Sequence, residues 1–469
     1  MERQTTLLIR DAEVIATMDD TRPEIRNGSI LIRDNEIVAV GETGSLDPRI
    51  AASADRVVDA RGHLAMPGMV NTHHHMFQSL TRALPSGQNS ELFSWLKTLY
   101  PIWANLTPEM IRASARLSVA ELLLSGCTTT SDHLYVFPDG VTLADSIEAA
   151  RDMGIRFCPT RGSMSIGQSQ GGLPPDSVVE KEDHILLDSQ RLVERHHDAS
   201  RFSMLQVALA PCSPFSVSRD LMRETALLAR SLGVRLHTHL AESMHDVHFS
   251  LERFGQTPSQ YVEDVGWLGE DVWHAHCVKL DDAGISAFAH SGTGVCHCPG
   301  SLMRLGAGVA PVRGMLDRGV PVGLGIDGSS SNEVSNLPHE MRLALLGART
   351  RAALTGEVVD GNAAELGPRD VLKLATTGGA RLLGRDDIGQ IRPGMAADLA
   401  LFDLADLAMA GSAVHDPVAA IVMNAPPRAA YTIVNGAVRV GKGQLIGADL
   451  DGIIAAHNRL ARQLVERAA

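Results

Sequence analysis

Three short segments of the chain carry two histidines separated by a single residue. The pairs are His73 and His75 in MVNTHHHM, His237 and His239 in HTHLAE, and His274 and His276 in HAHC. Side chains alternate along a β-strand, so the two members of each pair are expected to share a face and to reach one ion. Neutral imidazoles bind Zn2+ and related metals, and three or four such ligands hold the ion. One pair alone is weak evidence, because polar strand ends also carry histidines.

Two carboxylates occur in comparable positions. Glu242 closely follows His239, where a loop can turn it back towards the histidines, and Asp327 ends the apolar run VPVGLGID. A polar side chain satisfied in a loop explains any one of these residues. It does not explain their joint occurrence at the ends of several separate apolar runs. The pattern therefore predicts one metal-binding site assembled from distant segments.

Apolar runs alternate with helical patterns through the middle of the chain, and this alternation predicts what positions those residues. The predicted strands span residues 64–75, 128–133, 155–159, 204–211, 234–240, 271–276, 294–298 and 320–325. The predicted helices include 108–125, 140–153, 218–232, 281–290, 311–318, 337–353 and 368–383, the first opened by Thr107 as N-cap and Pro108. Strands mostly separated by helices predict an α/β fold, a (β/α)8 TIM-like barrel. Such barrels place catalytic groups at the C-terminal rim of the strands.

The pattern of apolar and polar residues at both ends of the chain differs from the pattern in the middle. Short alternating segments such as GSILIRDNEIVAVG and AAYTIVNGAVRV predict a small β-sandwich built from residues 1–65 and 385–469, beside a barrel of residues 66–384. An amphipathic helix over 451–467 closes the chain. The segment 161–183 is rich in Gly, Ser and Pro, and its place after the third barrel strand predicts a lid, with a disordered loop as the alternative.

Composition excludes several classes of protein. The 469 residues carry a net charge of −13, which argues against a nucleic-acid partner. The chain shows neither a secretory signal pattern nor an apolar run of the length that crosses a membrane. Six scattered cysteines are too few for a disulfide scaffold in a chain of this size, and they predict a cytoplasmic location.

The motifs PGMVNTHHH, HTHLAE, AHC and GIDG, together with GQIRPGMAADLALFD near the C-terminus, resemble the amidohydrolase superfamily. The similarity is to its branch of cytosine- and guanine-deaminase-like and chlorohydrolase-like enzymes, and it covers essentially the whole chain. It implies one divalent ion, Zn2+ or alternatively Fe2+. It also implies a homo-oligomer, because members of this family are often dimers. The implied ligands are His73, His75, His239 and Asp327. No lysine suited to bridging two metals ends the third or fourth strand, so a mononuclear site is expected.

The same resemblance implies roles for the remaining groups. Glu242 would shuttle protons to the substrate ring, His276 would hydrogen-bond the nucleophilic water or the departing group, and Asp327 would also accept a proton from that water. Each role suits hydrolysis of an amino group on an aromatic ring. Such a ring carbon is a poor electrophile until the neighbouring nitrogen is protonated.

The substrate is indicated by three further segments. Residues 131–138, 210–218 and 298–333 resemble those of 8-oxoguanine deaminases most closely. Deaminases of isocytosine, pterins such as isoxanthopterin, and hydroxylated s-triazines, together with triazine chlorohydrolases, are the alternatives. Candidate pocket residues are Gln78, Trp103, Tyr135, Cys212 and Ser329, with core packing as the alternative for Trp103 and Tyr135. A scaffold without activity is the other class of explanation, and the complete set of expected ligands argues against it.

Overall fold

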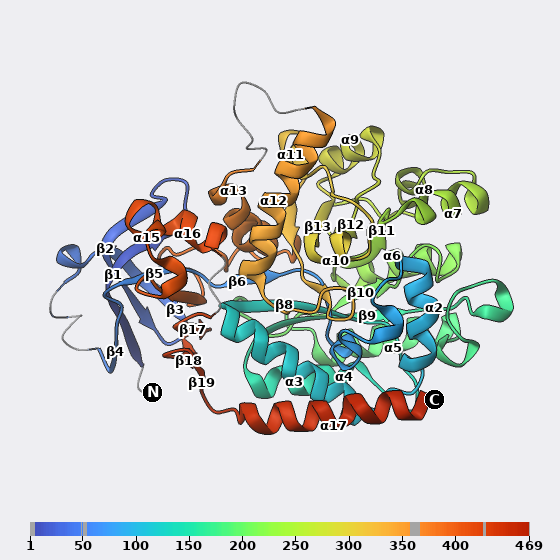
Figure 1. Ribbon diagram of the computed structural model, residues 1–469, viewed down its shortest axis with the longest axis horizontal. Coiled ribbons are helices and arrows are strands. Elements are labelled where there is room, and N and C mark those ends of the chain that lie inside the picture. Colours follow the sequence, from blue (N-terminus) through green and yellow to red (C-terminus); the bar gives the residue numbers. More distant parts are fainter. Residues whose placement is uncertain (1–4, 48, 50–53, 357–365, 425–427, 469) are drawn as a thin grey trace.

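The computed structural model describes residues 5–47, 49, 54–356, 366–424 and 428–468. An eight-stranded parallel sheet forms its centre, in the order β14-β13-β12-β11-β10-β9-β8-β6 (Figure 1). Its strands are β6 (Met69–Asn71), β8 (Cys127–Leu134), β9 (Arg156–Ser163), β10 (Ala208–Pro211), β11 (Leu236–Leu240), β12 (Val272–His276), β13 (Gly294–His297) and β14 (Val322–Leu324). The predicted α/β barrel is thereby confirmed, because every one of these strands overlaps a predicted one.

Loop backbone joins the first and last strands of this sheet into a closed barrel. The Thr72 amide donates to the Leu324 carbonyl at 3.0 Å, and the Asp327 amide donates to the His73 carbonyl at 3.0 Å. Just beyond, the short strands β7 (His74–His75) and β15 (Asp327–Gly328) pair in parallel. The segments that carry the first histidine pair and the aspartate therefore lie side by side at the rim.

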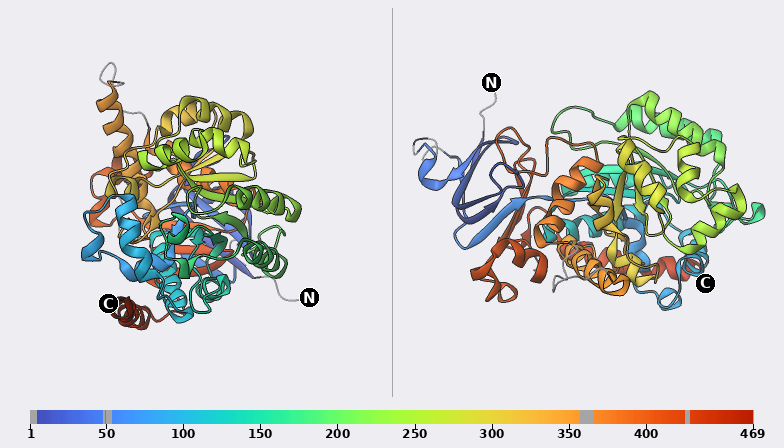
Figure 2. Two further views of the ribbon diagram at one scale, coloured as in Figure 1. Left: turned by 90° about the vertical axis from the view of Figure 1, so that its right-hand side faces the viewer. Right: turned by 90° about the horizontal axis from the view of Figure 1, so that it is seen from above.

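Helices cover the outside of the barrel (Figure 2). They are α2 (Leu92–Trp103), α3 (Pro108–Ser125), α4 (Leu143–Met153), α5 (Glu182–His196), α6 (Arg219–Leu232), α7 (Met244–Phe254), α8 (Pro258–Asp264), α9 (Asp282–Ser291), α10 (Pro299–Arg304), α11 (Val312–Asp317), α12 (Leu337–Thr355), α13 (Pro368–Lys373) and α14 (Gly379–Leu382). The predicted cap is present, since the Thr107 hydroxyl accepts from the Met110 amide at 3.3 Å. The prediction did not include α2, which turns out to cover the site.

The two chain ends form one mixed sheet of nine strands beside the barrel (Figures 1 and 2). Its strands are β1 (Thr6–Ala16), β2 (Glu24–Arg33), β3 (Glu36–Glu42), β4 (Arg56–Asp59), β5 (His63–Pro67), β16 (Leu399–Asp403), β17 (Tyr431–Val434), β18 (Ala437–Gly441) and β19 (Gln444–Leu445). The strand predicted at 64–75 is divided, because β5 pairs with β1 and β16 whereas β6 pairs with β8. An added Cβ on Gly68, between β5 and β6, would overlap the Thr128 side chain.

The closing helix α17 (Leu450–Ala468) packs on the barrel side of the molecule, against α2 and α3 (Figure 1). Its buried face includes His457, Leu460 and Leu464. Two further short helices, α15 (Ser412–His415) and α16 (Pro417–Asn424), accompany the terminal sheet. Within the described part of the chain, no helix combines the length and the apolar character that crossing a bilayer requires.

Candidate metal centre

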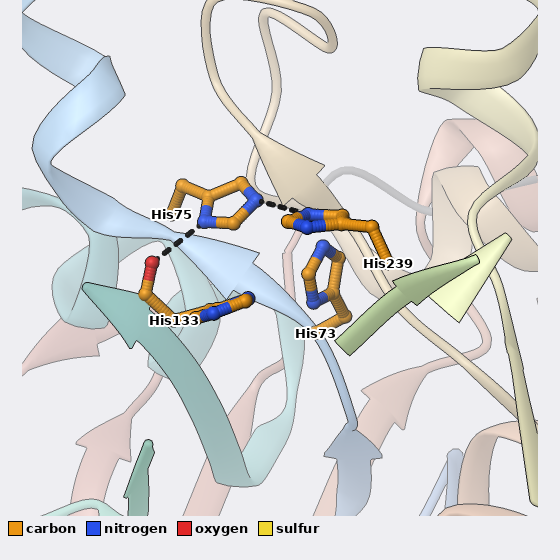
Figure 3. A group of neighbouring side chains, drawn as sticks. All are labelled: His73, His75, His133 and His239. Carbon is orange, nitrogen blue, oxygen red and sulfur yellow. Dashed lines mark hydrogen bonds between the residues drawn. The ribbon is translucent and has the colours of Figure 1, made fainter. Parts of the chain in front are cut away.

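Four side chains predicted as metal ligands converge at the C-terminal rim of the barrel. His75 Nε2 lies 3.0 Å from His239 Nε2, and Asp327 Oδ1 lies 3.3 Å from His75 Nε2 and 3.4 Å from His73 Nε2. Figure 3 shows the imidazoles of His73 and His75, from the segment after β6, grouped with that of His239 from β11. The structure thus brings the first, fifth and eighth strand ends together, as the spacing predicts.

Hydrogen bonds fix which ring nitrogens carry protons at this centre. His75 Nδ1 lies 2.7 Å from the His133 carbonyl oxygen, and His239 Nδ1 contacts the Cys212 carbonyl. A carbonyl can only accept, so both Nδ1 atoms donate and both Nε2 atoms keep a lone pair. Two lone pairs that face one another at 3.0 Å repel, unless a cation lies close to both. This donor set therefore fits a divalent metal ion.

Burial keeps the imidazoles in the neutral form that a metal requires. It lowers the pKa of His73 and His75, and it lowers the pKa of His239 to about 4. Although burial alone would raise it, the pKa of Asp327 lies well below its usual range, so this side chain is a carboxylate. Three neutral imidazoles and one carboxylate are consequently available together near neutral pH.

Glu242 lies beside this centre but outside it. Among the described residues, two overlapping groups of donor atoms each lie within 4.8 Å of one another, and neither group includes Glu242. One group is His73, His75, His133 and His239, and the other is His73, His239, His276 and Asp327. Its Oε2 lies 3.4 Å from His276 Nε2. Burial, followed by the nearby charges of Asp327 and Asp246, raises the pKa of Glu242 well above its ordinary value. Glu242 is therefore placed beside the centre, and its raised pKa favours the protonated form.

Three residues at the rim of the barrel, at or next to the site, have a left-handed backbone conformation. Ala241, His276 and Asp327 have φ angles of 49°, 76° and 66°. Such angles are strained for residues other than glycine and persist only where the surrounding structure enforces them. They occur here immediately before Glu242 and at two site residues themselves.

The left-handed backbone also corrects one prediction. His274 and His276 were expected to share a face, but His274 Nε2 lies 3.1 Å from the Trp267 carbonyl, and its ring stacks on Phe288 of α9. His276 instead lies within reach of Glu242. The alternation of side chains ends at His276 because its positive φ turns the side chain to the other side of the strand.

The cavity over the centre is small and mostly apolar. Its volume is about 30 Å3. The lining includes His75, Gln78, Leu92, Trp95, Leu96, Tyr100, Tyr135, Cys212, Phe215, His239, Glu242, His276, Leu305, Asp327 and Ser331. Three of the predicted pocket residues, Gln78, Tyr135 and Cys212, thus face the site. The Gln78 Oε1 atom is buried and has no hydrogen-bond partner.

Two other predicted pocket residues do not line this cavity. Trp103 is fully buried, donates from Nε1 to the Thr81 hydroxyl at 3.0 Å and packs edge-on against Phe77. Ser329 lies 3.3 Å from the Ser335 hydroxyl. Both side chains are fully buried and belong to the packing around the site.

The segment over the cavity is α2 and not the loop predicted as a lid. Residues 161–183 contribute nothing to the described cavity lining, whereas α2 contributes four side chains. Arg161, which begins that loop, is instead buried and bonded to Glu180 and Asp188. The Gly, Ser and Pro content of the loop indicated an irregular backbone but not its position.

The amidohydrolase profile matches residues 64–439, which is most of the chain. The chain belongs to the amidohydrolase family. The 8-oxoguanine deaminase of Pseudomonas aeruginosa is 45% identical to this amidohydrolase over 93% of this chain and 95% of that protein. An isoxanthopterin deaminase from an unknown prokaryotic organism is 36% identical over 99% and 98%. Atrazine chlorohydrolase TrzN from Arthrobacter aurescens TC1, whose crystal structure is complexed with zinc, is 36% identical and covers 97% of this chain and 100% of that one, with a TM-score of 0.90.

Two histidines of the amidohydrolase site were not assigned a role from the sequence. His133 ends β8, where its carbonyl holds His75 and its Nε2 donates to the Ala210 carbonyl at 2.8 Å. His237 Nε2 lies 2.7 Å from His73 Nδ1. Both residues stand at or near the end of a predicted strand, which was the available signal. Spacing alone cannot separate a ligand from a residue that orients a ligand.

Proposed function

We propose that this amidohydrolase is a metal-dependent aminohydrolase that converts 8-oxoguanine and water to urate and ammonia. The observation that carries the proposal is the convergence of three imidazole lone pairs and the Asp327 carboxylate beside a protonated Glu242. The 45% identity to an 8-oxoguanine deaminase over nearly the whole chain supports the choice of ring.

His73, His75, His239 and Asp327 are proposed to hold one divalent ion, Zn2+ in preference to Fe2+. The donor chemistry supports this, because neutral imidazoles and a carboxylate suit zinc and its neighbours. When bound, such an ion lowers the pKa of a water to about 7 and so supplies a nucleophile at neutral pH. The Ser331 hydroxyl donates to Asp327 Oδ2 at 3.2 Å and orients that carboxylate.

Glu242 is proposed to carry the protons that the reaction moves. As a carboxylic acid it can protonate the ring nitrogen next to the amino-bearing carbon, which makes that carbon electrophilic. The carboxylate that remains can take a proton from the attacking water and pass it to the departing ammonia. His276 Nε2 lies 3.4 Å from Glu242 Oε2. From this position His276 is proposed to hydrogen-bond either the water or the leaving group.

The polar groups in the cavity are proposed to recognise the amide edge of the ring. The unpartnered Gln78 Oε1 can accept from a ring N–H, and Tyr135 and Cys212 face the same space. Burial raises the pKa of Cys212 to about 12, so its sulfur stays a neutral thiol. A buried polar group left unpaired costs about 1–3 kcal/mol, so rings without the matching carbonyl and N–H are disfavoured.

Ammonia release across a panel of rings tests the substrate. 8-Oxoguanine should be the best substrate, with guanine slower and isocytosine and isoxanthopterin as the alternatives, while adenine and adenosine should be poorer by orders of magnitude. Efficient turnover of adenosine, or of a chlorinated triazine with no activity on the amino-oxo rings, would contradict the proposal. Metal-stripped enzyme in the same assay controls for contaminating deaminases.

Expectations about partners, assembly and location accompany this function. The small rings above are the proposed partners, and a homo-oligomer is expected, which light scattering in solution can measure. A cytoplasmic location is also proposed, because all six cysteines are buried and unpaired.

A further inference from the structure

A chain of buried hydrogen bonds leads from β12 to the first proposed ligand. His237 Nδ1 lies 2.9 Å from the Trp273 carbonyl oxygen, and His237 Nε2 lies 2.7 Å from His73 Nδ1. The Trp273 indole in turn donates to the Thr72 carbonyl at 3.1 Å. The side chains of this chain are buried, and the His237 ring stacks on Trp273 at 4.5 Å.

The chemistry of these atoms allows only one arrangement of protons for neutral rings. The Trp273 carbonyl can only accept, so His237 Nδ1 carries a hydrogen and His237 Nε2 offers a lone pair. His73 Nδ1 must then donate to that lone pair, which leaves a lone pair on His73 Nε2. That atom is buried without a hydrogen-bond partner and lies 3.4 Å from Asp327 Oδ1.

We propose that His237 is a positioning residue that fixes His73 in the tautomer and orientation needed to bind the metal. The inference rests on the proposed metal site and deepens it, because His237 itself offers the centre no lone pair. Outer partners of this kind typically change metal affinity by about 10- to 100-fold when removed. Trp273 contributes its backbone carbonyl, and its indole bond secures the backbone just before His73.

Zinc affinity of the metal-stripped protein tests this role, measured by competition with a chromophoric chelator. His237→Leu keeps the approximate volume but cannot accept from His73, and it should weaken zinc binding about 10- to 100-fold. His237→Gln retains an acceptor oxygen at a similar reach and should recover most of that loss. His274→Leu is the matched control, since it removes another buried histidine that faces a carbonyl outside the site.

The outcomes distinguish a failure of the proposed metal site from a failure of the positioning role of His237. If the unaltered chain binds no zinc, the proposed metal site fails. If it binds zinc but His237→Leu binds equally well, or if the Gln and Leu variants are equally weak, only the positioning role fails. Should the Leu variant not fold, His237→Asn serves instead, because its shorter side chain cannot reach His73.

A second inference follows from a different observation, the size of the cavity. Its volume of about 30 Å3 is only a few times the roughly 10–15 Å3 that a cavity needs in order to hold one water molecule. Pockets for small molecules commonly measure about 300–1,000 Å3. The cavity beside Glu242 is far below this size in this conformation, so admitting a heterocycle calls for movement of part of its wall.

The helix α2 has the features of that moving part. The four side chains that it places over the cavity, Leu92, Trp95, Leu96 and Tyr100, all precede Pro101. Proline inside a helix has no N–H to donate and weakens the helix at that point. Beyond it, Trp103 is fixed by its bond to Thr81.

The first turn of α2 is held to the opposite side of the mouth by a small set of contacts. Glu91 Oε2 lies 3.2 Å from His245 Nδ1 at the start of α7, and both side chains are partly exposed. The Phe93 ring lies 5.1 Å from both the Phe215 and the His245 rings. These contacts form a latch that joins the start of α2 to the turn after β10 and to the start of α7.

We infer that residues 91–100 are a lid that hinges at Pro101 and is latched by Glu91, Phe93, Phe215 and His245. The inference rests on the proposed function only in placing the substrate under α2. Opening moves the apolar side chains away from the cavity, and closing excludes water from the reacting groups.

A reversible cross-link tests the lid. The six native cysteines are buried, so a Glu91→Cys, His245→Cys double variant can be bridged selectively by a short bifunctional methanethiosulfonate. The bridged protein should show slowed amide exchange over 92–100, slowed removal of bound zinc by a chelator and lost turnover, and a reducing agent should restore all three. Equal amide exchange before and after reduction would refute the lid, whatever the substrate or metal. If bridging slows exchange but the reduced protein turns over none of the rings, the proposed function is refuted and the lid is not.

Discussion

Replacing Glu242 with glutamine separates proton transfer from metal binding. The variant keeps the shape of the side chain and can still hydrogen-bond near His276, but it cannot release a proton. Glu242 belongs to neither group of donors at the centre, so the variant should retain the metal. General acid–base catalysis contributes about 10²- to 10⁴-fold, so kcat should fall by that factor, equivalent to about 3–5 kcal/mol of activation free energy.

The pH dependence gives the same prediction a second readout. Burial raises the pKa of Glu242 well above its ordinary value. In the proposed mechanism the protonated form of Glu242 is the active one. Activity of the unaltered enzyme should therefore fall as pH rises through that raised pKa, and the residual activity of Glu242→Gln should lack this decline. The measurement is ammonia release against pH, with elemental analysis of each preparation.

Asp246→Asn provides the matched control, because it alters a neighbouring buried carboxylate that caps α7 and leaves the cavity lining intact. That variant should keep metal and most of the activity, with the decline at high pH moved to a somewhat lower pH, because one charge that raises the pKa of Glu242 is removed. Two results would refute the reasoning on Glu242. Purification of Glu242→Gln without metal would make Glu242 a ligand, and activity within about tenfold of the unaltered enzyme would remove it from proton transfer.

Three further predictions concern the metal and the packing around it. Elemental analysis should find one divalent ion per chain, and two ions at this cluster would overturn the ligand assignment. Metal-free protein should lose stability as pH falls from about 6.5 towards 4, because the pKa of His239 is lowered to about 4 in the fold while the unfolded chain binds its proton near 6.5. His239 alone accounts for up to about 3 kcal/mol of this loss, so thermal melting that does not change over this pH range would contradict the buried neutral state. Trp103→Phe should lower the free energy of unfolding by about 1–2 kcal/mol through the lost bond to Thr81. Its KM should be unchanged, and a large rise in KM would place Trp103 in contact with substrate after all.

The sequence alone determined where the chemistry lies along the chain. His73, His75, His239 and Asp327 each follow an apolar run, and the count of such runs predicts a barrel whose rim must collect them. The strand period then separates His74 from its two neighbours, and in the structure His74 turns away to the Ser335 hydroxyl. These features depend on local periodicity and on the topology of a parallel barrel, both of which are written in short stretches of residues.

Only the tertiary structure decided how those residues are used. The orienting contact of His237 on His73 joins residues 164 positions apart, and no spacing in the sequence reports it. His276 departs from the strand alternation because neighbouring elements hold its backbone at a positive φ. The place of α2 over the cavity depends on contacts with Phe215, in the turn after β10, and with His245 at the start of α7. Contacts between distant segments and enforced backbone angles arise when the whole chain packs, so local patterns cannot determine them.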